Sequence, residues 1–289
     1  MDFKNAKELL DLCNTHNLSI SEVMIEREIQ LGETTAEIID KKMSRVLEIM
    51  KDAAFLPIQN PVKSMGGLIG GEAEKLSLHH ASCKSLCGDL LEKAVTYAMA
   101  TLETNASMGL IVASPTAGSA GIVPGLLLAL QKIYDFSDTQ VKKALFNASA
   151  IGYLAMRNAT VAGAVGGCQA ETGIASAMAA SAAVELMGGT ALQCTYAAST
   201  VLMNMLGLVC DPVGGLVEYP CQNRNASGVA NALVAAELAL SGVTQLIPLD
   251  EMIATMYAVG KKIPVELRET ALGGCATTPS ACEACHMCS

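Results

Sequence analysis

The chain has 289 residues, of which 51% are apolar, 16% are charged and only 3% are aromatic, and its formal net charge is −9. This length is enough for one large domain, or two modest ones, with a sizeable core. The acidic charge argues against nucleic acid or an anionic membrane surface as a partner, because neither attracts an acidic protein. With so few aromatic residues, packing must rely on Leu, Met, Val, Ala and Gly, which favours helices packed on helices.

The first quarter of the chain predicts surface helices followed by a link. Residues 1–52 carry apolar residues at helical spacing, and Ser19 or Ser21 can serve as an N-cap for one of two or three helices. Residues 53–75 contain Pro57, Pro61 and two Gly pairs, which predicts a loop-rich connection.

The remainder predicts further helices, and Asp138 is the expected cap of one of them. They are expected over 88–105, 121–134, 139–156, 170–187, 191–207 and 226–241. Alternating strand patterns are poor, so we expect an all-α fold. A single helical main domain would span 56–274, with an N-terminal helical segment (1–55) packed on it and a Cys-rich tail (275–289).

Two long uncharged stretches, 108–131 and 186–210, are interrupted by Gly, and the first also by Pro. We interpret them as buried helices with breaks, because a lipid-facing break would leave backbone groups unsatisfied. The N-terminus lacks the basic and apolar regions of a signal peptide, so a cytoplasmic protein is expected. Its eleven cysteines are then expected to be reduced thiols, for which metal or cluster ligation is favoured over disulfides.

Three cysteines, Cys168, Cys210 and Cys221, each lie within a residue or two of Gly or Pro. Their wide spacing fits neither a zinc ribbon nor a ferredoxin run. Three thiolates from separate loops can hold three irons of a cubane cluster and leave the fourth iron open as a Lewis acid. From spacing alone, ordinary packing of buried thiols is the competing interpretation.

Gly pairs also recur where helices should start or stop, at 66–67, 70–71, 166–167 and 214–215. They fit helix caps and tight crossings. They fit equally with helix N-termini that converge on an anion, such as a carboxylate or an inorganic cluster.

Four motifs together make the sequence identifiable. They are "KSMGGLIGGEA", "SPTAGSAGIVPG", "GGCQAETGIASAMAA" and "CDPVGGLVEYPCQNRNASGVANA". Over about residues 60–275 the chain resembles the α subunit of bacterial iron–sulfur L-serine dehydratase. The resemblance implies a predominantly helical catalytic domain, a [4Fe–4S] cluster held by Cys168, Cys210 and Cys221, and conversion of L-serine to pyruvate and ammonia. The Gly/Pro-rich loops would converge on that cluster site in an oxygen-sensitive lyase.

The substrate carboxylate needs hydroxyls and free backbone N–H groups ahead of a helix. The candidates are Ser64, Gly66 and Gly67 in "KSMGG", and Ser114, Thr116 and Gly118 in "SPTAG". Alternatively, these hydroxyls only cap helices. Arg224 can recognise the carboxylate in a bidentate manner or pair with a structural acid. Glu171 can orient the site, form an ion pair with a basic residue, or cap the start of a helix.

No general base is evident, because none of the four histidines falls in a motif. His79 and His80 either face the site or form a solvated surface pair. The resemblance implies an accompanying domain or separate β subunit, so we expect a hetero-oligomer in which the base comes from the partner. The isolated chain should have little activity.

The tail "CATTPSACEACHMCS" can bind Zn²⁺ through Cys282, Cys285, Cys288 and His286, or form a partial ferredoxin-like run. The resemblance implies instead that a cysteine near the C-terminus folds back onto the fourth iron. Cys288 is the candidate, with Cys285 as its rival.

Three other functions stay open from the sequence. The chain can be a cluster-carrying electron-transfer or iron-sensing module, a pyridoxal-phosphate enzyme, or a helical scaffold with reduced core cysteines. No convincing motif for a Schiff-base lysine is present.

Overall fold

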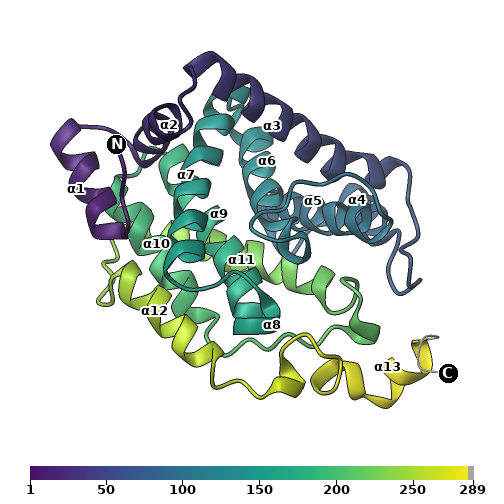
Figure 1. Cartoon of the computed structure of the whole chain (residues 1–289). Helices are drawn as coiled ribbons and strands as arrows, with labels where there is room; N and C mark the ends of the chain where they lie inside the picture. Colours follow the sequence, from purple (N-terminus) through teal and green to yellow (C-terminus); the bar gives the residue numbers. More distant parts are fainter. Residues whose placement is uncertain (286–289) are drawn as a thin grey trace.

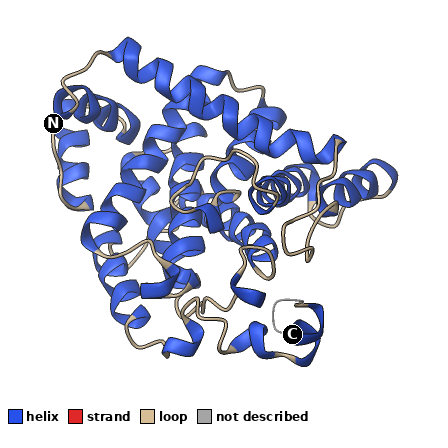
Figure 2. Cartoon of the chain, turned by 45° about the vertical axis from the view of Figure 1, so that its right-hand side comes forward, coloured by secondary structure: helices blue, strands red, loops and turns tan. Residues whose placement is uncertain are grey.

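The computed structural model describes residues 1–285, and within that part every regular element is a helix (Figure 2). The expected all-α fold is confirmed. The α-helices are α1 (Ala6–His16), α2 (Ile20–Leu31), α3 (Ala36–Gln59), α4 (Glu72–Ser82), α5 (Gly88–Ala106), α6 (Ile122–Tyr134), α7 (Asp138–Asn158), α8 (Gly163–Gly166), α9 (Ile174–Leu186), α10 (Ala191–Asn204), α11 (Cys221–Leu240), α12 (Leu249–Gly260) and α13 (Pro279–Ala284). Short 3₁₀ turns are η1 (Ala117–Ser119), η3 (Val213–Gly215), η4 (Val265–Leu267) and η5 (Gly274–Thr277), and η2 (Gln169–Gly173) is a π-helical turn.

Helix α9 is the centre of the core, and α6, α7, α10 and α11 pack around it (Figure 1). Every residue of α9 from Ile174 to Val184 is buried. The sequence of α9 is "IASAMAASAAVEL", and seven of its first nine residues are Ala or Ser. Because these side chains are small, neighbouring helices can approach α9 closely. Among residues 1–285, no helix is both long and apolar enough to cross a membrane.

The N-terminal helices pack on this core, as buried Phe3, Leu9 and Leu47 show. Ser19 is the N-cap of α2, as the sequence predicts. Its hydroxyl accepts the N–H of Glu22, and the Glu22 carboxylate accepts the N–H of Ser19, which completes a capping box.

The predicted loop at 53–75 is wrong in its first part, because α3 continues through Pro57 to Gln59. A proline inside a helix leaves the carbonyl four residues earlier without its usual donor. Here that carbonyl belongs to Ala53, and it accepts the Thr104 hydroxyl of α5 at 2.9 Å. A tertiary contact therefore offsets the lost helical bond, and the loop begins only at Asn60, the C-cap of α3.

Two predicted helix starts also differ from the structure. Ser137, not Asp138, caps α7, because its hydroxyl accepts the N–H of Gln140 in a second capping box. Helix α11 begins at Cys221, ahead of the predicted residue 226. The Asn225 side chain donates to the Cys221 carbonyl at 2.9 Å, which supports this first turn.

Candidate active site

The structure brings Cys168, Cys210 and Cys221 together from three separate segments. Cys168 precedes η2, Cys210 follows α10, and Cys221 is the first residue of α11. Their exposed fractions are only 4%, 4% and 9%. Burial raises the pKa of Cys221 to about 12, and Cys168 adds to that effect through its charge. The pKa of Cys210 is raised by burial and then by Cys168, so the three sulfurs act on one another electrostatically.

Cys210 is fixed by a short parallel bridge to the segment around Arg268. Its N–H donates to the Leu267 carbonyl at 2.9 Å, and its carbonyl accepts the N–H of Glu269 at 2.6 Å. This pairing brings residues 267–269 beside the cysteines. No sequence pattern predicts this pairing, because a single bridge has no alternation of apolar and polar residues.

Arg224 lies beside the thiols and is paired with an acid of its own chain. Its guanidinium contacts Asp211 Oδ1 at 2.7 Å and donates to the Val209 carbonyl at 2.9 Å. Burial would lower the pKa of Arg224, but Cys168 and Asp211 outweigh that effect and raise it. Of the two roles left open by the sequence, the geometry supports the structural pair and a cation close to the sulfurs.

The "KSMGG" loop binds a carboxylate that belongs to the chain itself, that of Glu218. Ser64 donates its hydroxyl to Glu218 at 2.6 Å, and the N–H groups of Gly66 and Leu68 donate at 2.6 and 3.0 Å. Gly67 follows with a positive φ of 76°, a conformation that glycine adopts without strain. Ser64 caps no helix, since the N-cap of α4 is Gly71. Substrate binding by Ser64, Gly66 and Gly67 stays a prediction.

Glu218 is a site residue that sequence reasoning missed. It is 2% exposed and lies between Cys210 and Cys221 in the chain. A single acid within the apolar run "GGLVEYPC" was the only available signal. Its partners lie far away in the sequence, so no local pattern could assign them.

The "SPTAG" loop contacts the start of α11, the helix whose first residue is Cys221. Ser114 is buried, and the Thr116 hydroxyl is 3.1 Å from that of Ser119. The carbonyl of Gly118 accepts the Asn225 side chain of α11 at 2.8 Å, which ties the loop to the helix that starts at Cys221. A role of Ser114, Thr116 and Gly118 in substrate binding stays a prediction.

Glu171 faces both this loop and the thiols. Cys210 donates its thiol proton toward Glu171 Oε2 across 3.8 Å, and the Thr116 hydroxyl lies close enough to lower the pKa of the carboxyl group. Burial raises the pKa of Glu171, and the negative charge of Glu269 adds to it. Within residues 1–285 no backbone N–H donates to this carboxylate, so the geometry does not support a capping role.

The C-terminal segment returns to the loop that carries Cys210 and Cys221, and it runs below α8 and α11 in Figure 1. The N–H of Cys275 donates to Asp211 Oδ2 at 2.6 Å. Cys285 is buried beside Val213, and its sulfur lies 2.7 Å from where a Cβ on Gly214 would stand. Cys288 and His286 lie outside the described residues.

The donor set fits the cofactor that the resemblance implies. In the described part of the chain, no three His, Cys, Asp or Glu side chains are placed to hold a single metal ion. The thiolates of an iron–sulfur cluster bind different irons, however, and need not converge on one point. Three buried thiols from three segments, with Arg224 nearby to offset negative charge, match a cluster with three protein ligands.

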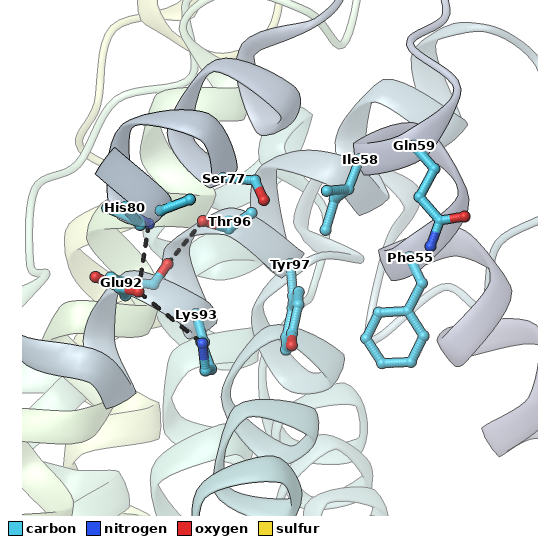
Figure 3. A pocket seen from close by; sticks show the side chains of 10 residues that line it. Phe55, Ile58, Gln59, Ser77, His80, Glu92, Lys93, Thr96 and Tyr97 are labelled. Carbon is cyan, nitrogen blue, oxygen red and sulfur yellow. Dashed lines mark hydrogen bonds and ion pairs between the residues drawn. The ribbon is translucent and has the colours of Figure 1, made fainter. Parts of the chain in front are cut away.

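A separate cavity of about 400 Å³ lies between α3, α4 and α5, and Figure 3 shows it. His80 points toward Glu92, with Nδ1 3.7 Å from the carboxylate, while Phe55 and Gln59 line the opposite side. His79 is exposed. None of the three cysteines lines this cavity, so the histidine pair belongs to a different part of the molecule from the thiols.

Comparison with known proteins agrees with the motifs. The family model described as serine dehydratase alpha chain matches residues 15–276. The "probable L-serine dehydratase, alpha chain" of Bacillus subtilis is 49% identical over 278 residues, which cover 96% of this chain and 92% of that protein. The "L-serine dehydratase, alpha chain" of Peptoniphilus asaccharolyticus is 46% identical over 94% of this chain and 93% of its own.

A longer relative is the "L-serine dehydratase" of Helicobacter pylori strain 26695, which is 39% identical over 285 residues. The match covers 96% of this chain but only 62% of that protein. The match to the family model spans most of the sequence and includes all three cysteine segments. The chain therefore belongs to the serine dehydratase alpha chain family.

Proposed function

We propose that this chain is the catalytic α subunit of an oxygen-sensitive L-serine dehydratase, which converts L-serine to pyruvate and ammonia. The observation that carries the proposal is the meeting of Cys168, Cys210 and Cys221, buried, beside the "SPTAG" loop. The names of the relatives, L-serine dehydratase alpha chain among them, supply the substrate.

Cys168, Cys210 and Cys221 would hold a [4Fe–4S] cluster. When bound, the cluster supplies an open iron that acts as a Lewis acid and makes the serine hydroxyl a better leaving group. The chain's own contribution is to shield this position from water, because the three cysteines are buried. Arg224 adds a positive charge that favours thiolates over thiols. A tail cysteine, Cys288 in our proposal, would cover the open position in the absence of substrate.

The substrate carboxylate would bind at the "SPTAG" loop, through the hydroxyls of Ser114 and Thr116 and the backbone of Gly118. The corresponding groups of the "KSMGG" loop are engaged by Glu218. We therefore assign that loop to the wall of the substrate site, where Ser64, Gly66 and Gly67 shape the pocket and contact the substrate only if Glu218 moves.

The proton on Cα would be removed by a base from a β subunit. Two observations support a partner. The relatives that match over more than nine tenths of their length are named alpha chains, and the longer relative extends well beyond the matched region. The enzyme would thus be a hetero-oligomer.

The test is anaerobic coexpression of this chain with a β subunit of the same enzyme, followed by measurement of pyruvate released from L-serine. The complex should form pyruvate, an iron chelator should abolish its formation, and the α chain alone should be nearly inactive. A complex that retains its iron and releases no pyruvate would instead favour the electron-transfer or iron-sensing function. Full activity of the iron-loaded α chain alone would contradict the role of the partner.

A further inference from the structure

The carboxylate of Glu171 occupies the space between the cysteines and the "SPTAG" loop. One oxygen, Oε2, is 3.8 Å from Cys210 Sγ. The other, Oε1, is 3.5 Å from where a Cβ on Gly118 would stand, and the nearby Thr116 hydroxyl lowers the pKa of the carboxyl group. Glu171 thus touches both a candidate cluster ligand and the loop assigned to the substrate carboxylate.

Room for this carboxylate depends on a glycine. A Cβ on Gly163 would stand 2.6 Å from Glu171 Oε2 and 2.9 Å from Cys210 Sγ, so any other residue would displace one of them. Gly163 has an ordinary helical conformation in α8, and its lack of a side chain is therefore required by space. The backbone of α8 closes one side of the Glu171 position.

The same carboxylate has no cation of its own. Within residues 1–285, no Lys, Arg or His nitrogen lies within 4.0 Å of it. Arg224, the cation close to the cysteines, is paired with Asp211 at 2.7 Å. The charge of Glu269 also acts on Glu171, and it has the same sign. The ionised form of a half-buried carboxylate among sulfurs and acids is unfavourable, in agreement with the raised pKa of Glu171, and a cation that joins it would favour that form.

We propose that Glu171 binds the α-ammonium group of the substrate. The inference rests on the proposed function, because L-serine carries one such cation two bonds from the carboxylate. With the carboxylate at the "SPTAG" loop and the hydroxyl directed toward the cysteines, the ammonium meets Glu171 between them. Three attachments to the groups around Cα also distinguish the two enantiomers of serine. Glu171 is thus a specificity-determining residue for 2-amino acids.

The test uses the iron-loaded complex with the β subunit and two inert analogues, L-alanine and propanoate, which differ only in the ammonium group. Each is measured as a competitive inhibitor of pyruvate formation. In the wild-type enzyme L-alanine should bind at least about tenfold more tightly, which corresponds to about 1.4 kcal/mol. In Glu171→Gln, the inhibition constant of L-alanine and the KM of L-serine should each rise about tenfold. The inhibition constant of propanoate should stay the same or fall.

Glu269→Gln is the matched control, because it removes another negative charge near the site. In this variant, the ratio of the inhibition constants of propanoate and L-alanine should stay within about twofold of the wild-type ratio. A Glu171→Gln enzyme that weakens both analogues equally, or that loses iron, would overturn the proposal in favour of a structural role. A shift confined to Glu269→Gln would overturn it as well. If Glu171→Gln fails to fold, equal binding of the two analogues by the wild type still contradicts the proposal. A wild-type complex that releases no pyruvate is a separate failure, that of the proposed function.

Discussion

Ser64 donates its hydroxyl to Glu218 across 2.6 Å and joins two motifs that are 154 positions apart in the chain. The Glu218 carboxylate also binds the N–H groups of Gly66 and Leu68. Glu218 follows Cys210 and precedes Cys221, so the loop that carries two of the three thiols is fastened to the "KSMGG" loop by one buried acid. A change in either loop is therefore expected to affect the other.

Removing this acid should destabilise the fold. Glu218→Ala leaves one hydroxyl and two N–H groups without their acceptor, and an unsatisfied buried group costs about 1–3 kcal/mol. We expect the free energy of unfolding in urea to fall by at least about 2 kcal/mol. Glu237→Ala, on the exposed side of α11, is the control and should change it by less than about 0.5 kcal/mol. Equal effects of the two substitutions would show that Glu218 does not stabilise the contact between the two loops.

The packing of α6 on α5 depends on Gly125. A Cβ there would stand 2.8 Å from the Ala94 carbonyl and 2.9 Å from the Ala98 Cβ, and backbone cannot give way easily. Gly125→Ala should therefore lower the free energy of unfolding by about 1–3 kcal/mol. Gly152→Ala is a matched change in α7, where the three atoms nearest the new methyl all belong to the flexible Met178 side chain, with the sulfur at 3.0 Å. It should be nearly neutral, and thermal unfolding of both variants checks the difference.

Glu103 should make stability depend on pH. It is 1% exposed, and burial raises its pKa above the ordinary value of 4.5, with donors such as the Ala73 N–H opposing that effect only in part. The unfolded chain then ionises at lower pH than the folded one, so the contribution of Glu103 is full below 4.5 and is lost as pH rises through its folded pKa. Glu103→Gln has no carboxyl group to ionise, so its free energy of unfolding does not decrease with pH for this reason. Its free energy of unfolding, relative to wild type, should increase between pH 4.5 and pH 7, and a constant difference across this range would contradict the prediction.

The extent to which the sequence predicts this site depends on how local each feature is. Cys168 and Cys221 lie in motifs that are recognisable from the local sequence alone. The Ala-rich stretches predict the bounds of α9 and α10 to within a few residues. Glu218 and the bridge from Cys210 to Arg268 depend on partners distant in the chain. Pro57 favours a loop in the sequence, and the helix continues through it only because the Thr104 hydroxyl of another helix compensates. Hydrophobic periodicity reports only local patterns, so it cannot predict tertiary contacts that replace local hydrogen bonds.

Thiol reactivity should separate buried from exposed cysteines. Burial raises the pKa of Cys13 to about 12, so this thiol stays protonated at pH 8 and is a poor nucleophile. Cys83 is exposed. Iodoacetamide at pH 8 should therefore modify Cys83 rapidly and leave Cys13 unmodified, as peptide mass spectrometry can show. In denaturant all eleven cysteines should react. Equal rates at Cys13 and Cys83 in the folded chain would contradict the described burial.

The most direct test of the central claim compares Cys221→Ser with Cys83→Ser in anaerobically reconstituted complexes with the β subunit. Iron per chain and pyruvate released from L-serine are measured in the same samples. Because Cys221 is buried beside Cys168 whereas Cys83 is exposed, only the first substitution should abolish both signals. A Cys221→Ser complex that keeps its iron and continues to release pyruvate would contradict the account.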